Sequence, residues 1–378
     1  MASVLELHKN GKIEIRNRQP ISNRKILSKV YTPGVAEVCK VIHKDKENAH
    51  KYTIKGNTVA IVTDGTAVLG LGDIGPEAAL PVMEGKAAIF RQFAGINAFP
   101  ICVDTKDVDE IVNLVKQISP TFGAVNLEDI SAPRCFEIEE KLLKELDIPV
   151  FHDDQHGTAI VVLAALINSL KILKMKFSDI RIVISGAGAA GIAVAKLLLK
   201  MKPKDIILVD SKGIIYQGRK ENMNKAKEQI AVLTNKDKQK GSLADAVKGN
   251  NVFIGVSRPG ILTEEMVRTM NQPVIFALSN PVPEIMPDKA LNAGARIVAT
   301  GRSDFPNQIN NALVFPGLFK GLLKTKLQLN DAIKLRAAKA LASIIKNPKP
   351  SKIIPDIFNK KIVDAVASSV KRGVKNEI

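Results

Sequence analysis

The sequence has no tryptophan, three tyrosines and only three cysteines among its 378 residues. Because Cys39, Cys102 and Cys135 are odd in number and widely spaced, we expect neither a disulfide framework nor a thiolate zinc site, and a cytoplasmic location fits. The longest apolar run, from Ala159 to Ile167, is far shorter than the 18 residues that a membrane span needs. No apolar run follows a basic region near residue 1, so no signal peptide is expected.

The excess of positive over negative charge is confined to the second part of the chain. The formal net charge is +17; residues 1–160 contain 19 Lys and Arg against 22 Asp and Glu, whereas residues 161–378 contain 36 against 16. Nucleic-acid binding is one interpretation of such asymmetry, but aromatic residues, which stack on bases, make up only 4% of the chain. We therefore predict a solvated basic surface and no nucleic-acid partner. Attraction of anionic substrates and cofactors is a second use of this charge.

The order of apolar segments predicts an α/β fold with two domains. The first fifty residues are polar and predict short helices and loops, whereas from Thr58 short apolar strands alternate with glycine turns and helices, as in parallel sheets. An apolar helix from Gly157 to Leu173 is expected to join the domains. We predict an α/β substrate and metal domain over residues 1–156, and a Rossmann-type, doubly wound dinucleotide-binding domain with C-terminal helices over residues 157–378. Strands are predicted over residues 59–62, 98–103, 124–127, 149–151, 181–185, 205–210, 251–256, 273–278 and 295–299.

A glycine-rich turn lies between a predicted strand and a helix in the second domain. It reads Gly186-Ala187-Gly188-Ala189-Ala190-Gly191, and Asp210 stands 22 residues beyond Gly188, at the end of the next strand. This context matches the dinucleotide fingerprint, in which glycines let the pyrophosphate approach a helix N-terminus and the acid binds the ribose hydroxyls. Asp210 favours NAD because it would repel a 2′-phosphate, although Lys212 would accept one. A tight turn without a ligand is the alternative.

Two acidic pairs follow two predicted strands of the first domain. Glu128 and Asp129 follow one strand, and Asp153 and Asp154 follow the next. If these strands are neighbours, their ends lie about 5 Å apart, and four crowded carboxylates then require a cation. Oxygen ligands favour Mg²⁺ or Mn²⁺; zinc is disfavoured, because the two nearby histidines lack a third nitrogen or sulfur ligand. Ordinary helix capping by aspartate is the alternative.

Four further side chains are weak indicators when each is taken alone. Lys86 lies within a predicted helix beside apolar residues, where a lowered pKa would make it a general base, or else it is a snorkelling surface lysine. Tyr31 lies at a turn and by itself indicates little. Asn280 and Asn311 follow strands of the second domain, where they would hold a carboxylate or carboxamide, unless they only cap loops.

Taken together, these residues resemble the malic enzymes, and specifically their short bacterial and archaeal form. The resemblance covers about residues 20–330, with these motifs in the family's order and spacing: YTPGVA, LGLGDIGPEAALPVMEGKAAIF, NLEDI, FHDDQHGTA, GAGAAG, SNP and SDFPNQINNALVFPG. It implies oxidative decarboxylation of L-malate to pyruvate and CO₂, with reduction of NAD or NADP and dependence on Mg²⁺ or Mn²⁺. It also implies a homodimer.

The resemblance also implies roles for the candidate residues. Tyr31 corresponds to the general acid and Lys86 to the general base. The remaining correspondences are metal ligands at Glu128, Asp129 and Asp154, a carboxylate beside the catalytic lysine at Asp153, substrate-binding amides at Asn280 and Asn311, and cofactor contacts at the glycine turn, Asp210 and Asn280. Many longer members have an arginine that clamps the malate carboxylate where Ala67 stands here, so the group that binds this carboxylate is left open.

Two other functions are open from the residues alone. One is an NAD-dependent dehydrogenase that acts on another 2-hydroxy acid without decarboxylation. The other is a catalytically silent nucleotide- or nucleic-acid-binding protein that uses the basic half. The joint presence of Tyr31, Lys86 and the carboxylates argues against the second alternative.

Overall fold

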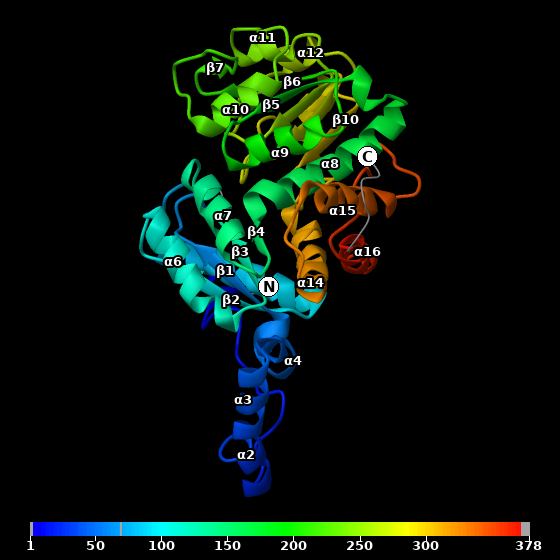
Figure 1. Ribbon diagram of the computed structural model, residues 1–378. Coiled ribbons are helices and arrows are strands. Elements are labelled where there is room, and N and C mark those ends of the chain that lie inside the picture. Colours follow the sequence, from blue (N-terminus) through cyan, green and yellow to red (C-terminus); the bar gives the residue numbers. More distant parts are fainter. Residues whose placement is uncertain (1–2, 69, 372–378) are drawn as a thin grey trace.

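Two β-sheets lie one beyond the other and are linked by the long helix α8 (Asp153–Leu173), as the computed structural model in Figure 1 shows. The structure describes residues 3–68 and 70–371. The predicted α/β class, with one sheet in each half of the chain, is confirmed. The predicted boundary between residues 156 and 157 lies inside α8, which starts four residues before the predicted helix.

The first sheet is parallel throughout, with strand order β2-β1-β3-β4. Its strands match the predicted ranges to within one residue at each end: β1 (Thr58–Thr63), β2 (Asn97–Cys102), β3 (Ala124–Leu127) and β4 (Val150–His152). In the β3–β4 pair, Leu127 lies opposite His152. The acidic residues that follow these two strands therefore reach the same edge of the sheet.

Helices cover both faces of the first sheet. One face packs against α6 (Val108–Ile118) and α7 (Arg134–Glu145), and the other against α5 (Pro76–Ile89), which continues as the π-helical turn η3 (Phe90–Ala94). Helix α6 begins where the Asp107 side chain accepts hydrogen bonds from two backbone amides of the first turn. Helix α7 starts after Pro133 with no side-chain cap.

The second sheet has the strand order β10-β9-β8-β5-β6-β7. Its parallel strands are β5 (Arg181–Ser185), β6 (Asp205–Asp210), β8 (Val252–Gly255), β9 (Val274–Ala277) and β10 (Ile297–Thr300), all close to the predicted ranges. The two-residue strand β7 (Gly213–Ile214) is antiparallel and was not predicted. Strands β6 and β7 lie on one side of β5, and the later strands β8, β9 and β10 lie on the other side. The strand order therefore reverses between β5 and β8, and ligands of such sheets bind at this switch point.

The second sheet is also covered on both faces. Helices α8, α9 (Ala189–Leu199) and α10 (Lys225–Leu233) pack on one face, and α11 (Leu243–Val247), α12 (Glu264–Arg268) and α13 (Pro287–Asn292) pack on the other. By length and composition α8 would suffice to cross a membrane, yet 67% of its most apolar stretch is buried inside the protein. Helix α8 is therefore a core helix that both domains share.

The C-terminal helices return to the first domain. Helices α14 (Phe315–Thr325), α15 (Asp331–Ser343) and α16 (Lys361–Ser369) pack together below α8 (Figure 1). Phe319 of α14 lies edge-to-face against Phe90 and Phe151 of the first domain, with ring centroids 5.2 and 5.3 Å apart. The sequence grouped these helices with the second domain, whereas α14 packs on the first sheet.

The N-terminal segment extends from the body as an arm that contains α2 (Arg24–Val30), α3 (Val35–Lys44) and α4 (Ala49–Tyr52) (Figure 1). The N-terminal segment also contains α1 (Val4–His8) and the 3₁₀ turns η1 (Lys46–Asn48) and η2 (Ile54–Asn57). The chain after α1 and the turn η2 lie against the first domain, because the Lys12 amide donates to Glu84 Oε2 at 3.2 Å and Lys55 Nζ donates to the Phe122 carbonyl at 2.9 Å. No described residue from 3 to 57 is buried. Large apolar side chains such as Leu27, Val30 and Val41 are exposed on this arm. The arm therefore lacks a core within its own chain.

Candidate active site

Three carboxylates meet where β3 and β4 end. One oxygen from each of Glu128, Asp129 and Asp154 lies within 4.8 Å of the others, and residues 3–68 and 70–371 contain no other such group of metal-binding side chains. The Asp129 amide donates a hydrogen bond of 2.8 Å to Asp154 Oδ2, with Asp129 in the left-handed region at φ 52°. The structure thus brings together the two acidic pairs that the sequence places on neighbouring strands.

The second acidic pair lies on the first turn of α8 rather than in a loop. Asp153 and Asp154 are favoured there because the N-terminal end of a helix carries partial positive charge. Gly157, one turn later, is required by close packing, since a Cβ atom at this position would lie 1.9 Å from Asp153 Oδ1 and 3.0 Å from Asn311 Cβ. Asn311 therefore lies close to Asp153.

Lys86 of α5 lies in the same cluster and is only 7% exposed. Its Nζ atom is 2.5 Å from Glu128 Oε2, donates a short hydrogen bond to Asp153 Oδ2, and lies 4.5 Å from the centroid of the Phe315 ring. Burial lowers the pKa of the Lys86 ammonium, but Asp153 and Glu128 raise it more, so its pKa lies above its usual value. The predicted lowering of this pKa is wrong for this state, because the apolar setting is outweighed by two carboxylates.

Burial also makes the carboxylates hard to ionise. It raises the pKa of Asp129 to about 9, that of Glu128 to about 7 and that of Asp154 to about 6, and neighbouring carboxylates add to each rise. Asp129 Oδ2 is buried without a hydrogen-bond partner. A bound divalent cation would relieve this crowding, and a set of oxygen ligands alone suits Mg²⁺ or Mn²⁺. The residues present therefore fit the metal.

The glycine turn of the second domain fits a dinucleotide. Gly186 has φ 109°, a Cβ atom at Gly191 would lie 1.8 Å from the Gly186 carbonyl oxygen, and Gly188 is the N-cap of α9 with open space beside it. The turn is therefore tight, and the N-terminus of α9 is open to an anionic group.

The main chain at Asn280 approaches the first domain, because a Cβ atom at Gly70 would lie 2.1 Å from the Asn280 carbonyl oxygen.

Comparison with known proteins gives the same family for both domains. Residues 10–143 match the family model for the malic enzyme N-terminal domain, and residues 155–375 match the model for the malic enzyme NAD binding domain. The chain belongs to the malic enzyme family. The predicted family is thus confirmed.

Individual malic enzymes resemble the chain over nearly its full length. A bifunctional malic/malolactic enzyme from Bacillus subtilis is 55% identical over 98% of this chain and 92% of its own, and an NAD-dependent malic enzyme from Geobacillus stearothermophilus is 55% identical over 96% and 77%. The crystal structure of an NAD-dependent malic enzyme from Thermotoga maritima superposes with a TM-score of 0.95 at 47% identity, covering 98% of this chain and 100% of that one.

Tyr31, the predicted general acid, lies away from the acidic cluster. It directly follows α2, which Figure 1 shows in the part of the arm farthest from the first sheet, and it is 67% exposed. Within a single chain, the tyrosine therefore does not join Lys86.

Glu139 of α7 is a site residue that the sequence analysis missed. Its carboxylate accepts hydrogen bonds from the His152 amide at 3.1 Å, Gln155 Nε2 at 3.0 Å and His156 Nε2 at 2.8 Å. Burial raises the pKa of Glu139, but His156 lowers it more, to about 2. The sequence feature that indicates Glu139 is its position four residues after Cys135, which places a charged side chain on the buried face of an amphipathic helix.

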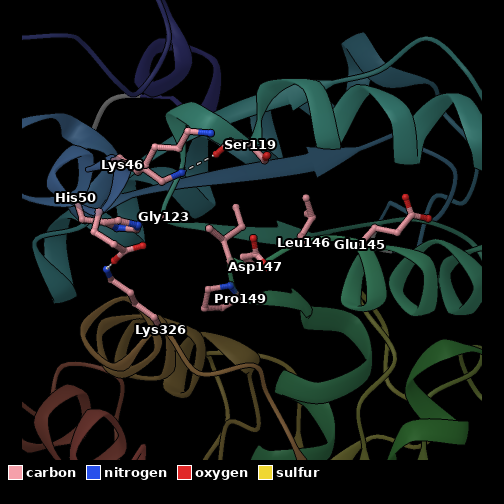
Figure 2. A pocket seen from close by; sticks show the side chains of 12 residues that line it. Lys46, His50, Ser119, Gly123, Glu145, Leu146, Asp147, Pro149 and Lys326 are labelled. Carbon is pink, nitrogen blue, oxygen red and sulfur yellow. Dashed lines mark hydrogen bonds and ion pairs between the residues drawn. The ribbon is translucent and has the colours of Figure 1, made fainter. Parts of the chain in front are cut away.

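A separate cavity of about 270 Å³ lies at the opposite edge of the first sheet, where β3 and β4 begin. Figure 2 shows Lys46, His50 and Lys326 on one side of it and Asp147 with Pro149 on the other. None of the residues assigned to the catalytic cluster lines this cavity. It is therefore distinct from the candidate active site of this malic enzyme.

Replacing Glu139 should weaken metal binding, because its three hydrogen bonds hold the turn that carries Asp153 and Asp154. We expect Glu139→Ala to reduce Mn²⁺ affinity by about 10- to 100-fold, the usual cost of losing a group that orients metal ligands. Electron paramagnetic resonance of free Mn²⁺ measures this directly. The matched control is Glu140→Ala, which removes an exposed carboxylate paired with Lys144 and should leave the affinity unchanged. An unchanged affinity in folded Glu139→Ala protein would contradict the assignment.

Proposed function

We propose that this chain catalyses the oxidative decarboxylation of L-malate to pyruvate and CO₂, with NAD or NADP as the hydride acceptor. One observation supports this most strongly: Lys86 is buried between Asp153 and Glu128, beside a cluster of oxygen ligands, in a chain whose other domain is the NAD binding domain of malic enzymes. We also propose the division into residues 1–156 and 157–378, and a cytoplasmic location.

Glu128, Asp129 and Asp154 are the proposed ligands of an Mg²⁺ or Mn²⁺ ion. When bound, this ion would act as a Lewis acid that polarises the oxygen on malate C2 and stabilises negative charge during decarboxylation. Asn126 assists on the protein side, because its Nδ2 donates to Glu128 Oε2 at 2.9 Å and so orients that carboxylate. Asn280 and Asn311 are the proposed amides for substrate, and Asn280 is also a proposed cofactor contact.

Lys86 is the proposed general base. Its ammonium first gives a proton to Asp153, with which it already shares a short hydrogen bond. The free amine then takes the proton of the malate C2 hydroxyl while hydride leaves C2 for the nicotinamide, and CO₂ departs from the resulting keto acid. Base assistance of this kind contributes about 10²–10⁴-fold to the rate.

Tyr31 is the proposed acid that protonates enolpyruvate at C3, and we infer that it acts across a homodimer. The arm that carries it has no buried residue and exposes Leu27, Val30 and Val41. Apolar side chains gathered in this way mark a surface that a partner covers. In the proposed dimer, each arm packs on the other protomer, and the partner subunit's Tyr31 completes the site around Lys86.

The proposed reaction is tested by incubating the purified chain with L-malate, Mn²⁺ and NAD⁺ or NADP⁺. We expect pyruvate, CO₂ and reduced nicotinamide in equal amounts, with turnover lost on chelation and restored by Mn²⁺ or Mg²⁺. Asp154→Asn should raise the Mn²⁺ concentration required by about tenfold or more, because one ligand charge is removed. Oxaloacetate as the final product, or full turnover in metal-free buffer, would contradict the proposal.

The shared site is tested by complementation between two inactive variants. Tyr31→Phe and Lys86→Ala should each be nearly inactive alone. Co-expressed with different tags, they should recover about one quarter of native activity, because half of randomly formed dimers are mixed and each mixed dimer has one intact site. The control pair is Lys86→Ala with Asp154→Asn, whose positions lie in one chain's cluster and should not complement. No recovery in the first pair, with mixed dimers isolated, would place Tyr31 in its own chain's site.

A further inference from the structure

Asp210 at the end of β6 is surrounded by hydrogen-bond donors from its own chain. Its Oδ1 atom accepts from Arg219 Nη1 and the Lys212 amide, both at 2.9 Å. Its Oδ2 atom accepts from Lys227 Nζ at 2.7 Å, from Asn222 Nδ2 at 3.0 Å and from Arg219 Nη2. An ionised carboxylate offers about four acceptor positions, so five donors leave none of them free. The expected free acceptor for the ribose hydroxyls is therefore absent.

Two of these donors are buried cations. The side chains of Arg219 and Lys227 are 5% and 9% exposed. Lys227 lies in the first turn of α10, where the helix dipole disfavours positive charge, so its placement depends on Asp210 and on the Asn222 carbonyl, which accepts from Nζ at 2.8 Å. One carboxylate against two cations leaves the group with net positive charge.

The position of this group is that of the adenosine ribose in a Rossmann domain. The Gly186 amide donates to the Val209 carbonyl at 2.8 Å, so the glycine turn lies beside the end of β6. In this fold the ribose binds at the residue that ends this strand, where a 2′-phosphate also lies when the cofactor carries one. A group with net positive charge at that place is suited to a phosphate.

We propose that Arg219 and Lys227 form a latent 2′-phosphate site, which the Asp210 carboxylate occupies in the native chain. Phosphate oxygens accept hydrogen bonds from guanidinium and ammonium groups as carboxylate oxygens do, and a phosphate carries more negative charge than a carboxylate. Asp210 thus disfavours NADP by filling the site rather than by presenting a net negative charge. Arg219 and Lys227 are specificity-determining residues on this account, which rests on the NAD(P) site of the proposed function.

The test measures binding of two nucleotide fragments by isothermal titration calorimetry, with no turnover involved. The probes are 5′-AMP, which lacks the extra phosphate, and 2′,5′-ADP, which carries it. In the native protein we expect 2′,5′-ADP to bind no more tightly than 5′-AMP, because the Asp210 carboxylate occupies the place of the 2′-phosphate. In Asp210→Ser, 2′,5′-ADP should bind at least tenfold more tightly, equivalent to about 1.4 kcal/mol, while 5′-AMP changes little. Asp210→Asn, which keeps the side-chain shape, should give a smaller gain and serves if the serine variant does not fold.

Two further variants identify the source of the gain. Adding Lys227→Met to Asp210→Ser should abolish most of it. Glu221→Gln is the matched control, because Glu221 pairs with Lys212 at 2.9 Å and its loss removes one negative charge near the site without changing Arg219 or Lys227. A similar gain in Glu221→Gln, a gain that survives Lys227→Met, or no gain in either Asp210 variant would overturn the proposal. Failure of malate decarboxylation with intact 5′-AMP binding would instead contradict the proposed function alone.

Discussion

The buried ion pairs of Lys86 with Glu128 and Asp153 are the interactions on which the rest of this site depends. Burying an ammonium or a carboxylate is costly unless each charge has a partner. Here four carboxylates share one ammonium, so full ionisation would leave excess negative charge in a largely buried cluster. Burial and this crowding raise the pKa values of these carboxylates, and they are the physical reason to expect a divalent cation at Glu128, Asp129 and Asp154.

The shared helix α8 connects this cluster to the dinucleotide domain. Its first turn carries Asp153 and Asp154, and the helix packs against α9, whose N-terminus holds the glycine turn. The second half of the chain also closes the acidic site directly, since the Phe315 ring covers Lys86 and Asn311 lies beside Gly157. The residues proposed to bind substrate and cofactor are thus arranged around one largely buried helix.

The sequence predicts the parallel strands well, because strands buried on both faces are continuous apolar runs between glycine and acidic turns. It also predicts the acidic cluster, since neighbouring parallel strands end at one edge. The start of α8 was not predicted, because Asp-Asp-Gln-His-Gly is polar and contains a glycine. The partners of Glu139, Asp210 and Lys86 depend on tertiary contacts that no local pattern contains, and the role proposed for Tyr31 requires a second chain.

The central claim is that the edge formed by β3, β4 and α8 binds one divalent cation through carboxylate oxygens alone. Crystals of the protein soaked in Mn²⁺ test it most directly, through anomalous diffraction at the manganese edge. The account predicts one strong peak in each chain, within coordination distance of Glu128, Asp129 and Asp154. A peak bound instead by His152 or His156, or no peak at this edge under saturating Mn²⁺, would contradict it.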